Sequence, residues 1–422
     1  MRRALLAPTL TLIAACTYAQ IDADLLARDK RIKEHLANKS YTQAITEIEA
    51  QAKAATGTTW QDSLWSYVYP LGDAQWKAKG PDAAAIAAES LYQRIVSAKR
   101  SPEWEVKALI KLSALYYDLS KLKEYERVGA LALATAERNA DRIPPIVLAD
   151  AHYCMALTHM DLGRDDAALP LTQRAISLAQ GIKPGPVKRL PTYFSGQGGA
   201  LRRLGRTRDA EASFNEGIAM AERDTSLEAL SIRAVLLGNL AILVQSTGDL
   251  HRSKEVNARA LHAMNEVIER TKSDPQQQTS ARYNRTRIML NLASTYFDMA
   301  DFDRAGSYLR TAQAERKELL GEGHPAVVGL NEGIAEVEAM AGNHELAEQL
   351  LLEQIQAVSA SNEGGKETMM NLQCKLARMA AKQGHLARAD SIYAVALPRD
   401  GPMIASSSSK YLANALGERA DL

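Results

Sequence analysis

A short pattern of small residues recurs along the sequence and restricts the fold more than any other feature. In its first clear copy, Gly163 is followed five positions later by Ala168. A glycine at a helix C-terminus adopts positive φ without a clash of a Cβ atom. The copies lie about 42 residues apart, with one longer interval. They begin at Gly163, Gly205, Gly248, Ala300, Gly342 and Gly384 and end at Ala168, Ala210, Ser253, Ala305, Ala347 and Ala389.

Two further small positions accompany each copy, one on either side of the turn. A spacing of seven residues returns to the same face of a helix. Each copy therefore predicts two antiparallel helices that are joined by a tight turn and cross closely at small residues. The small residues are Ala156, Gly198, Ala241, Ala293, Ala335 and Ala377 before the turn, and Ala175, Gly217, Ala260, Ala312 and Ala396 after it, with Gln354 as the exception.

Weaker copies precede Gly163, with Tyr125, Ala84 and Ala44 in the place of the second small residue. Together the copies predict an all-α fold, a solenoid of about nine antiparallel helix pairs. One interval is about ten residues longer than the others. A polar stretch at 271–279, which contains Pro275, accounts for the extra length and predicts a long loop.

The turn and the small positions resemble the tetratricopeptide repeat, in the longer form of kinesin light chain. Asn239-Leu-Ala and Asn291-Leu-Ala are similar to the Asn-Leu-Ala signature of the first helix of that repeat, and the segment 320–325 is similar to its linker. The resemblance covers residues 101–397 well and residues 20–100 poorly. It implies a right-handed superhelix that binds proteins or peptides and that is not an enzyme.

The first hundred residues depart from the pattern and contain most of the tryptophans. Two interpretations are open: extra core for divergent capping repeats, or an aromatic recognition surface. The four tryptophans of the chain are Trp60, Trp65, Trp76 and Trp104.

The N-terminus has the composition of a bacterial-type export leader. Arg2 and Arg3 precede an apolar stretch that is too short to span a bilayer. Cleavage after Ala19 would make residues 1–19 a signal peptide, whereas lipidation of Cys16 would make the chain an outer-membrane lipoprotein. We expect an exported protein, periplasmic or extracellular, whose only membrane attachment is a lipid on Cys16. No later apolar stretch is expected to approach the length of a transmembrane helix.

Chemical motifs are incomplete wherever the sequence approaches one. His344 and Glu345 begin like a zinc-protease helix, but Glu348 stands where the second histidine is required. His152 and His159 are two helical turns apart and cannot share one ion. Cys154 and Cys374 are expected to lie several repeats apart, which excludes a disulfide. We therefore expect no catalytic residue, no metal and no cofactor.

The overall charge gives no reason to expect nucleic acid as the partner. The chain has 51 basic and 50 acidic side chains, a net charge of +1. Nucleic acid would require a continuous basic track, whereas basic and acidic residues alternate along the expected binding face. The partner is therefore expected to be a protein or an extended peptide.

The resemblance also implies which residues contact that partner. In the family, contacts come from first-helix positions on the concave face, and an asparagine there holds the backbone of an extended peptide. Asn239 and Asn291 match that asparagine. Plain solvated helix surface is the alternative for each position. The expected binding residues are Tyr153, Leu157, Arg202, Arg203, Asn239, Gln245, Asn291, Phe297, Glu332, Glu336, Lys375 and Arg378.

A second functional interpretation comes from the same resemblance. Similar arrays form the N-terminal part of bacterial proteins that end in a caspase-like CHAT protease domain, so the chain could be the regulatory array of such a system, with its protease missing or encoded separately. Residues 398–422 are expected to form only a linker and a short helix. The sequence thus divides into 1–19, 20–100, 101–397 and 398–422.

Overall fold

The computed structural model describes residues 7–183, 188–322, 324–360 and 366–397, and every regular element in these ranges is helical. The chain groups into two compact units, residues 1–232 and 233–422. The expected helix at 398–422 lies outside the described residues. Helix α1 begins at Ala7, within the expected leader.

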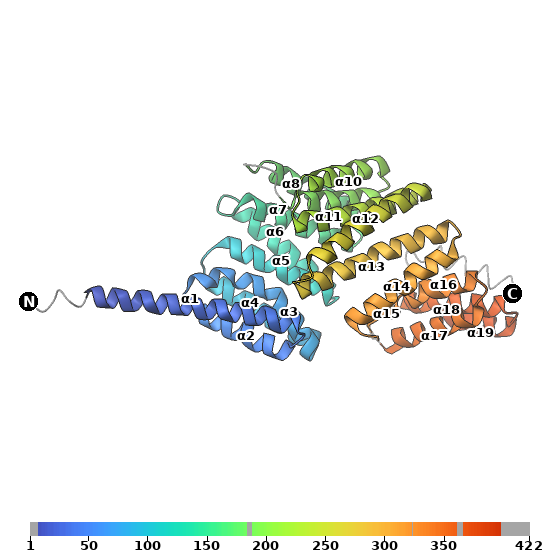
Figure 1. Ribbon diagram of the computed structural model, residues 1–422, viewed down its shortest axis with the longest axis horizontal. Coiled ribbons are helices and arrows are strands. Elements are labelled where there is room, and N and C mark those ends of the chain that lie inside the picture. Colours follow the sequence, from blue (N-terminus) through green and yellow to red (C-terminus); the bar gives the residue numbers. More distant parts are fainter. Residues whose placement is uncertain (1–6, 184–187, 323, 361–365, 398–422) are drawn as a thin grey trace, which may run out of the picture. The chain divides into compact units, whose positions relative to one another are not determined.

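Unit 1 is a succession of helices that pack on their neighbours in the chain (Figure 1). Its elements are α1 (Ala7–Ala37), α2 (Tyr41–Ala54), the 3-10 helix η1 (Thr59–Tyr67), α3 (Val68–Lys79), α4 (Pro81–Ser97), α5 (Pro102–Asp118), α6 (Leu122–Arg138), α7 (Pro145–Asp161), α8 (Asp165–Gln180), α9 (Leu190–Arg203) and α10 (Thr207–Glu222).

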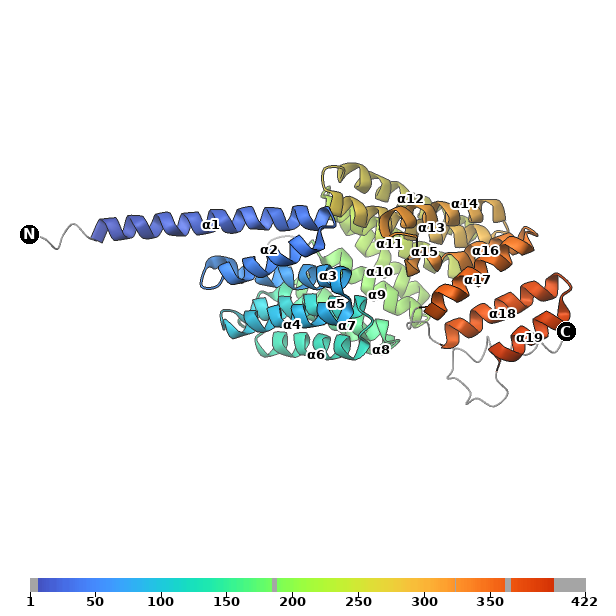
Figure 2. The ribbon, with the colours of Figure 1, turned by 90° about the horizontal axis from the view of Figure 1, so that it is seen from below.

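Unit 2 is likewise a succession of helices that pack on their neighbours in the chain (Figure 2). Helix α11 (Leu227–Ser246) includes residues of both units. Apart from α15, the described helices of both units form nine successive pairs, α1 with α2 through α18 with α19. The remaining elements are α12 (Leu250–Arg270), α13 (Pro275–Asp298), α14 (Phe302–Leu320), α15 (Pro325–Val328), α16 (Asn331–Met340), α17 (His344–Ala360), α18 (Lys366–Lys382) and α19 (Leu386–Ala396). The predicted helical pairs are confirmed, and the right hand of the superhelix stays a prediction.

The turn within each pair has the predicted left-handed residue. The φ angle is +72° at Gly163 and +59° even at Ala300, which carries a Cβ atom. The next amide closes the turn, as where Arg164 N donates to His159 O over 2.8 Å. Lys39 and Ser120 also have positive φ, at the same place in the weaker copies. The sequence pattern missed these two because neither is a glycine, the residue that marks this place in most of the clear copies.

The small residues lie where the paired helices cross. Ala305 and Ala168 have no exposed surface, and the exception Gln354 is also buried. The crossing leaves no space for a side chain at Gly198, where a Cβ atom would lie 2.5 Å from Cε1 of Phe214. The predicted mechanism of pairing is therefore confirmed: small side chains allow close approach, and large neighbours fill the space beside them.

The prediction of a long loop at 271–279 is wrong. Helix α13 begins at Pro275, so the connection is only a turn, and the extra residues lengthen the helices instead. Proline is tolerated at the first position of a helix because that amide has no helical partner. The carboxylate of Asp274 accepts a hydrogen bond from Gln277 N at 3.0 Å and so caps α13.

The tryptophans of the N-terminal pairs mainly extend the core. Trp60, Trp65 and Trp104 pack against the buried cluster of α1 to α6, and Lys107 Nζ lies 4.6 Å from the ring centre of Trp104. Trp76 is the most exposed of the four. The packing interpretation therefore accounts for three of the tryptophans.

Helix α11 contradicts the expectation that no stretch after the leader approaches the length of a transmembrane helix. Its 20 residues are long and apolar enough to cross a membrane by length and composition alone, with a mean hydropathy of 1.8 over its most apolar window. More than half of that window is buried within the fold. Apolar faces on both sides are what a first helix needs when it packs against a partner helix and a neighbouring pair.

We expect Ala305→Arg to destabilise the fold by about 3 kcal/mol or more, because it forces an unpaired charge into a closed helix crossing. Urea unfolding followed by circular dichroism measures the loss. Lys317→Ala on the same helix is the control and should cost less than about 0.5 kcal/mol, since its ion pair with Glu322 is exposed. Equal losses in the two variants would mean that the small position has been misassigned.

Candidate functional site

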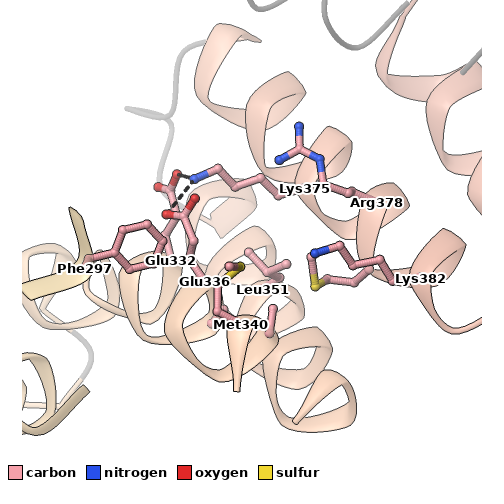
Figure 3. A pocket seen from close by; sticks show the side chains of 11 residues that line it. Phe297, Glu332, Glu336, Met340, Leu351, Lys375, Arg378 and Lys382 are labelled. Carbon is pink, nitrogen blue, oxygen red and sulfur yellow. Dashed lines mark ion pairs between the residues drawn. The ribbon is translucent and has the colours of Figure 1, made fainter. Parts of the chain in front are cut away.

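Two hollows lie in unit 2, lined mainly by the first helix of each helix pair, and α13 contributes to both. The asparagine hollow, of about 50 Å³, lies among α11, α12 and α13. The methionine hollow, of about 90 Å³, lies among α13, α16, α17 and α18 (Figure 3). The first is lined by Val235, Gly238, Asn239, Ile242, Met264, Asn284, Arg287, Ile288 and Asn291, and the second by Phe297, Glu332, Ala335, Glu336, Ala339, Met340, Leu351, Lys375, Arg378, Met379 and Lys382.

The methionine hollow is bounded on one side by ion pairs between neighbouring helix pairs. Lys375 Nζ on α18 lies 2.7 Å from a carboxylate oxygen of Glu332 and 3.6 Å from one of Glu336, both on α16. Figure 3 shows the Lys375 side chain reaching across to these two carboxylates. The charge of Lys375 is thereby neutralised, and its contribution is to hold α18 to α16.

The opposite side of this hollow is cationic and its interior is apolar. Arg378 and Lys382 follow Lys375 at intervals that keep all three on one face of α18. Lys382 has no ion pair among the described residues. Met340 and Leu351 supply apolar surface, and methionine adapts its shape to irregular partners. The hollow can therefore hold an apolar group beside an anionic one.

The asparagine hollow combines amides with apolar walls. Asn291 Nδ2 donates to Gly238 O over 3.4 Å, which is long for such a bond. Asn239 and Asn284 are half-buried, and Arg287 is exposed at the edge. Carboxamides both donate and accept hydrogen bonds, so they match the main-chain amides of an extended peptide.

Gln245, another expected binding residue, serves mainly to join helices. Its Nε2 donates to Ser294 Oγ at 2.8 Å and to Asp298 Oδ2 at 2.6 Å, and its Oε1 accepts from Thr295 Oγ1 at 3.3 Å. These bonds tie the end of α11 to α13. Gln245 is therefore less available to a partner than Asn291, whose single bond is long.

Unit 1 contains the other expected binding residues, and none of them lines either hollow. Tyr153 is buried, with its ring centre 5.0 Å from that of Tyr193, so it is a packing residue and we withdraw it as a contact residue. Leu157 is exposed. Burial, and next the charge of Arg203, lowers the pKa of Arg202. Arg203 Nε pairs with Asp165 at 2.6 Å.

Several lining residues were not among the expected ones. Asn284 and Arg287 precede Asn291 by seven and four residues, so helical periodicity from Asn291 would have identified them. Met340 is half-exposed, and Met379 and Leu351 are buried at the bottom of the hollow. Nothing in the repeat pattern distinguishes these three from ordinary core residues.

Candidate metal ligands are not gathered anywhere in the described ranges. No cluster of three or more histidine, cysteine or acidic side chains there could hold a metal ion. Cys154 and Cys374 are buried and are not joined in a disulfide, and burial raises the pKa of the Cys154 thiol to about 11, which keeps it protonated at neutral pH. Burial also lowers the pKa of His152.

Comparisons with known proteins agree with this architecture. A tetratricopeptide-repeat profile matches residues 285–326. No curated protein matches the sequence. Three solved structures are similar to the chain and are described next; all are below 25% identity, so the likeness concerns the fold.

The first is aspartyl phosphate phosphatase F from Bacillus subtilis, at 10% identity and a TM-score of 0.51, covering 90% of this chain and 96% of that one. The second is a Rap protein complexed with Competence and Sporulation Factor, at 10% identity and a TM-score of 0.50, covering 86% of this chain and 98% of that one. The third, putative kinesin light chain repeats from Podosopora anserina, has 15% identity and a TM-score of 0.40 and covers 52% and 99%.

This fold is generally a non-catalytic scaffold built from repeated helix pairs. The profile match falls on α13 and α14, the pair that carries the second Asn-Leu-Ala signature and contributes to both hollows. By this match, residues 285–326 form a tetratricopeptide repeat, and the helix pairs of the chain resemble those of tetratricopeptide-repeat proteins in fold.

Proposed function

We propose that this protein is an exported scaffold that binds an extended peptide, or an extended segment of a protein, along the first helices of unit 2. One observation carries the proposal: α13 contributes to two hollows, one lined by amides and one by apolar and cationic groups. An extended peptide needs both kinds of surface. A Rap protein of the same fold was solved with a bound factor, which is consistent with the proposal.

The two hollows would act on different parts of the peptide. The carboxamides of Asn239 and Asn291 would hydrogen-bond the main chain, which has the same donors and acceptors at every residue. The methionine hollow would take an apolar side chain against Met340 and Leu351. The first hollow would then supply affinity for any extended chain, and the second would select among sequences.

The charged residues of the methionine hollow would further restrict which peptide sequences bind. Lys375 is paired with both Glu332 and Glu336, so that side of the methionine hollow is anionic overall, whereas Lys382 on the other side has no ion pair among the described residues. An acidic side chain next to the apolar one would complement it. The alternation of anionic and cationic groups on this face does not suit nucleic acid, which requires a continuous basic surface.

Asn239→Ala combined with Asn291→Ala should weaken binding of all peptides by about 1–3 kcal/mol in total, because each lost hydrogen bond is worth around 1 kcal/mol. The probe is a set of peptides selected from a random-sequence display library against residues 20–422, with affinities measured by calorimetry. The control is Asn215→Ala, an exposed asparagine on α10 that lines neither hollow. Unchanged affinity in the double variant, with the fold intact, would contradict binding at the asparagine hollow.

Lys382→Glu should change which peptides are selected and should not remove binding. Acidic residues beside the apolar position should be lost from the selected sequences, and the salt dependence of association should decrease. Lys317→Glu is the control for added negative charge, because Lys317 lies on α14 and lines neither hollow. The same sequence preferences in Lys382→Glu and in the wild type would show that the peptide does not occupy the methionine hollow.

Export is proposed from the leader sequence, and its two forms are separable. Deletion of residues 1–19 should retain the protein in the cytoplasm of a bacterial host. Palmitate labelling that is lost in Cys16→Ala would identify a lipoprotein, whereas an unlabelled protein that begins at Gln20 would identify ordinary cleavage. A full-length protein found in the cytoplasm with Met1 retained would contradict export.

A further inference from the structure

Asn257 on α12 is a buried amide without a hydrogen-bond partner. Its side chain has no exposed surface, and neither Nδ2 nor Oδ1 has a partner within hydrogen-bond distance. A buried polar group in this condition destabilises the folded state, because the same group is hydrogen-bonded to water when the chain is unfolded. A residue of this kind is unfavourable for stability alone and calls for another explanation.

The other repeats show what this position normally holds. Asn257 follows the second small residue of its pattern, Ser253, by four positions. The other second helices have mostly large apolar side chains there, and Thr172 satisfies its hydroxyl on Leu169 O at 2.8 Å. Asparagine is thus the exception at a position that otherwise supports helix packing. The six residues are Thr172, Phe214, Asn257, Leu309, Leu351 and Tyr393.

The register of the helices places Asn257 beneath the asparagine hollow. Ser253 Oγ donates to Ala241 O over 3.0 Å and lies 3.1 Å from Thr295 Oγ1. One turn further along α12 corresponds to one turn back on the antiparallel α11 and α13, at Gly238 and Asn291. Met264, two turns beyond Asn257 on the same face of α12, is buried and lines the hollow. Asn257 therefore lies at the level of the hollow, behind its wall.

At this level, α11 has no side chain at the side of the asparagine hollow, and only a long hydrogen bond joins α11 to α13 there. Gly238 has no side chain, whereas the corresponding positions of other first helices carry residues such as Tyr153 and Leu290. A Cβ atom at Gly238 would lie 3.6 Å from Asn291 Nδ2. The bond from Asn291 to Gly238 O, at 3.4 Å, is near the upper limit for a hydrogen bond and costs little to break.

We propose that Asn257 is a positioning residue for peptide binding at the asparagine hollow. When the carboxamide of Asn291 turns to the peptide main chain and leaves Gly238 O, Nδ2 of Asn257 donates to that carbonyl oxygen. The buried amide of Asn257 thus gains a hydrogen bond in the bound state only. This inference rests on the proposed function, because it assigns Asn257 a part in the same binding event.

The test is Asn257→Leu, which replaces the amide with an apolar group of similar size. Removal of an unsatisfied buried amide should raise the melting temperature. Affinity for the library-selected peptides should fall about tenfold. Opposite changes in stability and affinity cannot come from a purely structural role, in which both would fall together. The control is Thr172→Val at the same repeat position in unit 1, which should leave affinity unchanged.

Two results would overturn the inference. A higher melting temperature with unchanged affinity would make Asn257 an unfavourable residue without a part in binding, and a lower melting temperature would make it a structural one. Asn257→Ser, which keeps one hydrogen-bonding group, should recover part of the affinity, and no recovery would also count against the inference. If the double variant of Asn239 and Asn291 weakens binding and Asn257→Leu does not, this inference alone fails. If neither does, the proposed function fails.

Discussion

The close crossing of two helices at small residues is the constraint on which the rest of this structure depends. Because Ala305, Ala168 and their equivalents are fully buried, a larger group there would force the helices of a pair apart. The left-handed turn that precedes each of them reverses the chain in a few residues, so the second helix returns directly onto the first. Each pair then needs only its neighbours to complete its apolar surface, and the array extends without one central core.

The asparagine hollow lies where this packing is relaxed. At α12 the small residue is Ser253 and the packing residue is Asn257, so hydrogen-bonding groups replace part of the apolar contact. Gly238 removes a side chain from the facing helix. The asparagine hollow forms at this place, whereas pairs with Phe214 or Tyr393 in the equivalent position are filled. A binding site on a repeat array can thus arise from a few polar substitutions at positions that elsewhere maintain the fold.

The repeat pattern predicted the helix pairs because each small residue has one physical role, and that role is visible in a single sequence. It did not predict the lengths of α12 and α13, because Pro275 is equally compatible with a loop and with the start of a helix. The partner contacts implied by the family resemblance include seven residues that line the two hollows, Asn239, Asn291, Phe297, Glu332, Glu336, Lys375 and Arg378. Tyr153 was misplaced because a large residue on a first helix serves packing or recognition according to its neighbours, which the sequence does not give. Met340 and Asn257 were missed for the same reason.

Three kinds of interaction hold α13 to its neighbours, each along a different part of the helix. Its first turns are joined to α14 by ions, with Arg282 and Arg285 both within 2.9 Å of Glu315 and Arg282 also paired with Glu318. Its middle is held by the hydroxyl and amide bonds of Thr295 and Asn291, and Phe297 near its end contacts Phe302. Dissolved salt screens the exposed pair with Glu318 far more than the buried Glu315 and hardly affects the other two parts of the helix. Raised salt would therefore loosen α13 first at its N-terminal end, within a turn of Asn284 and Arg287, which line the asparagine hollow.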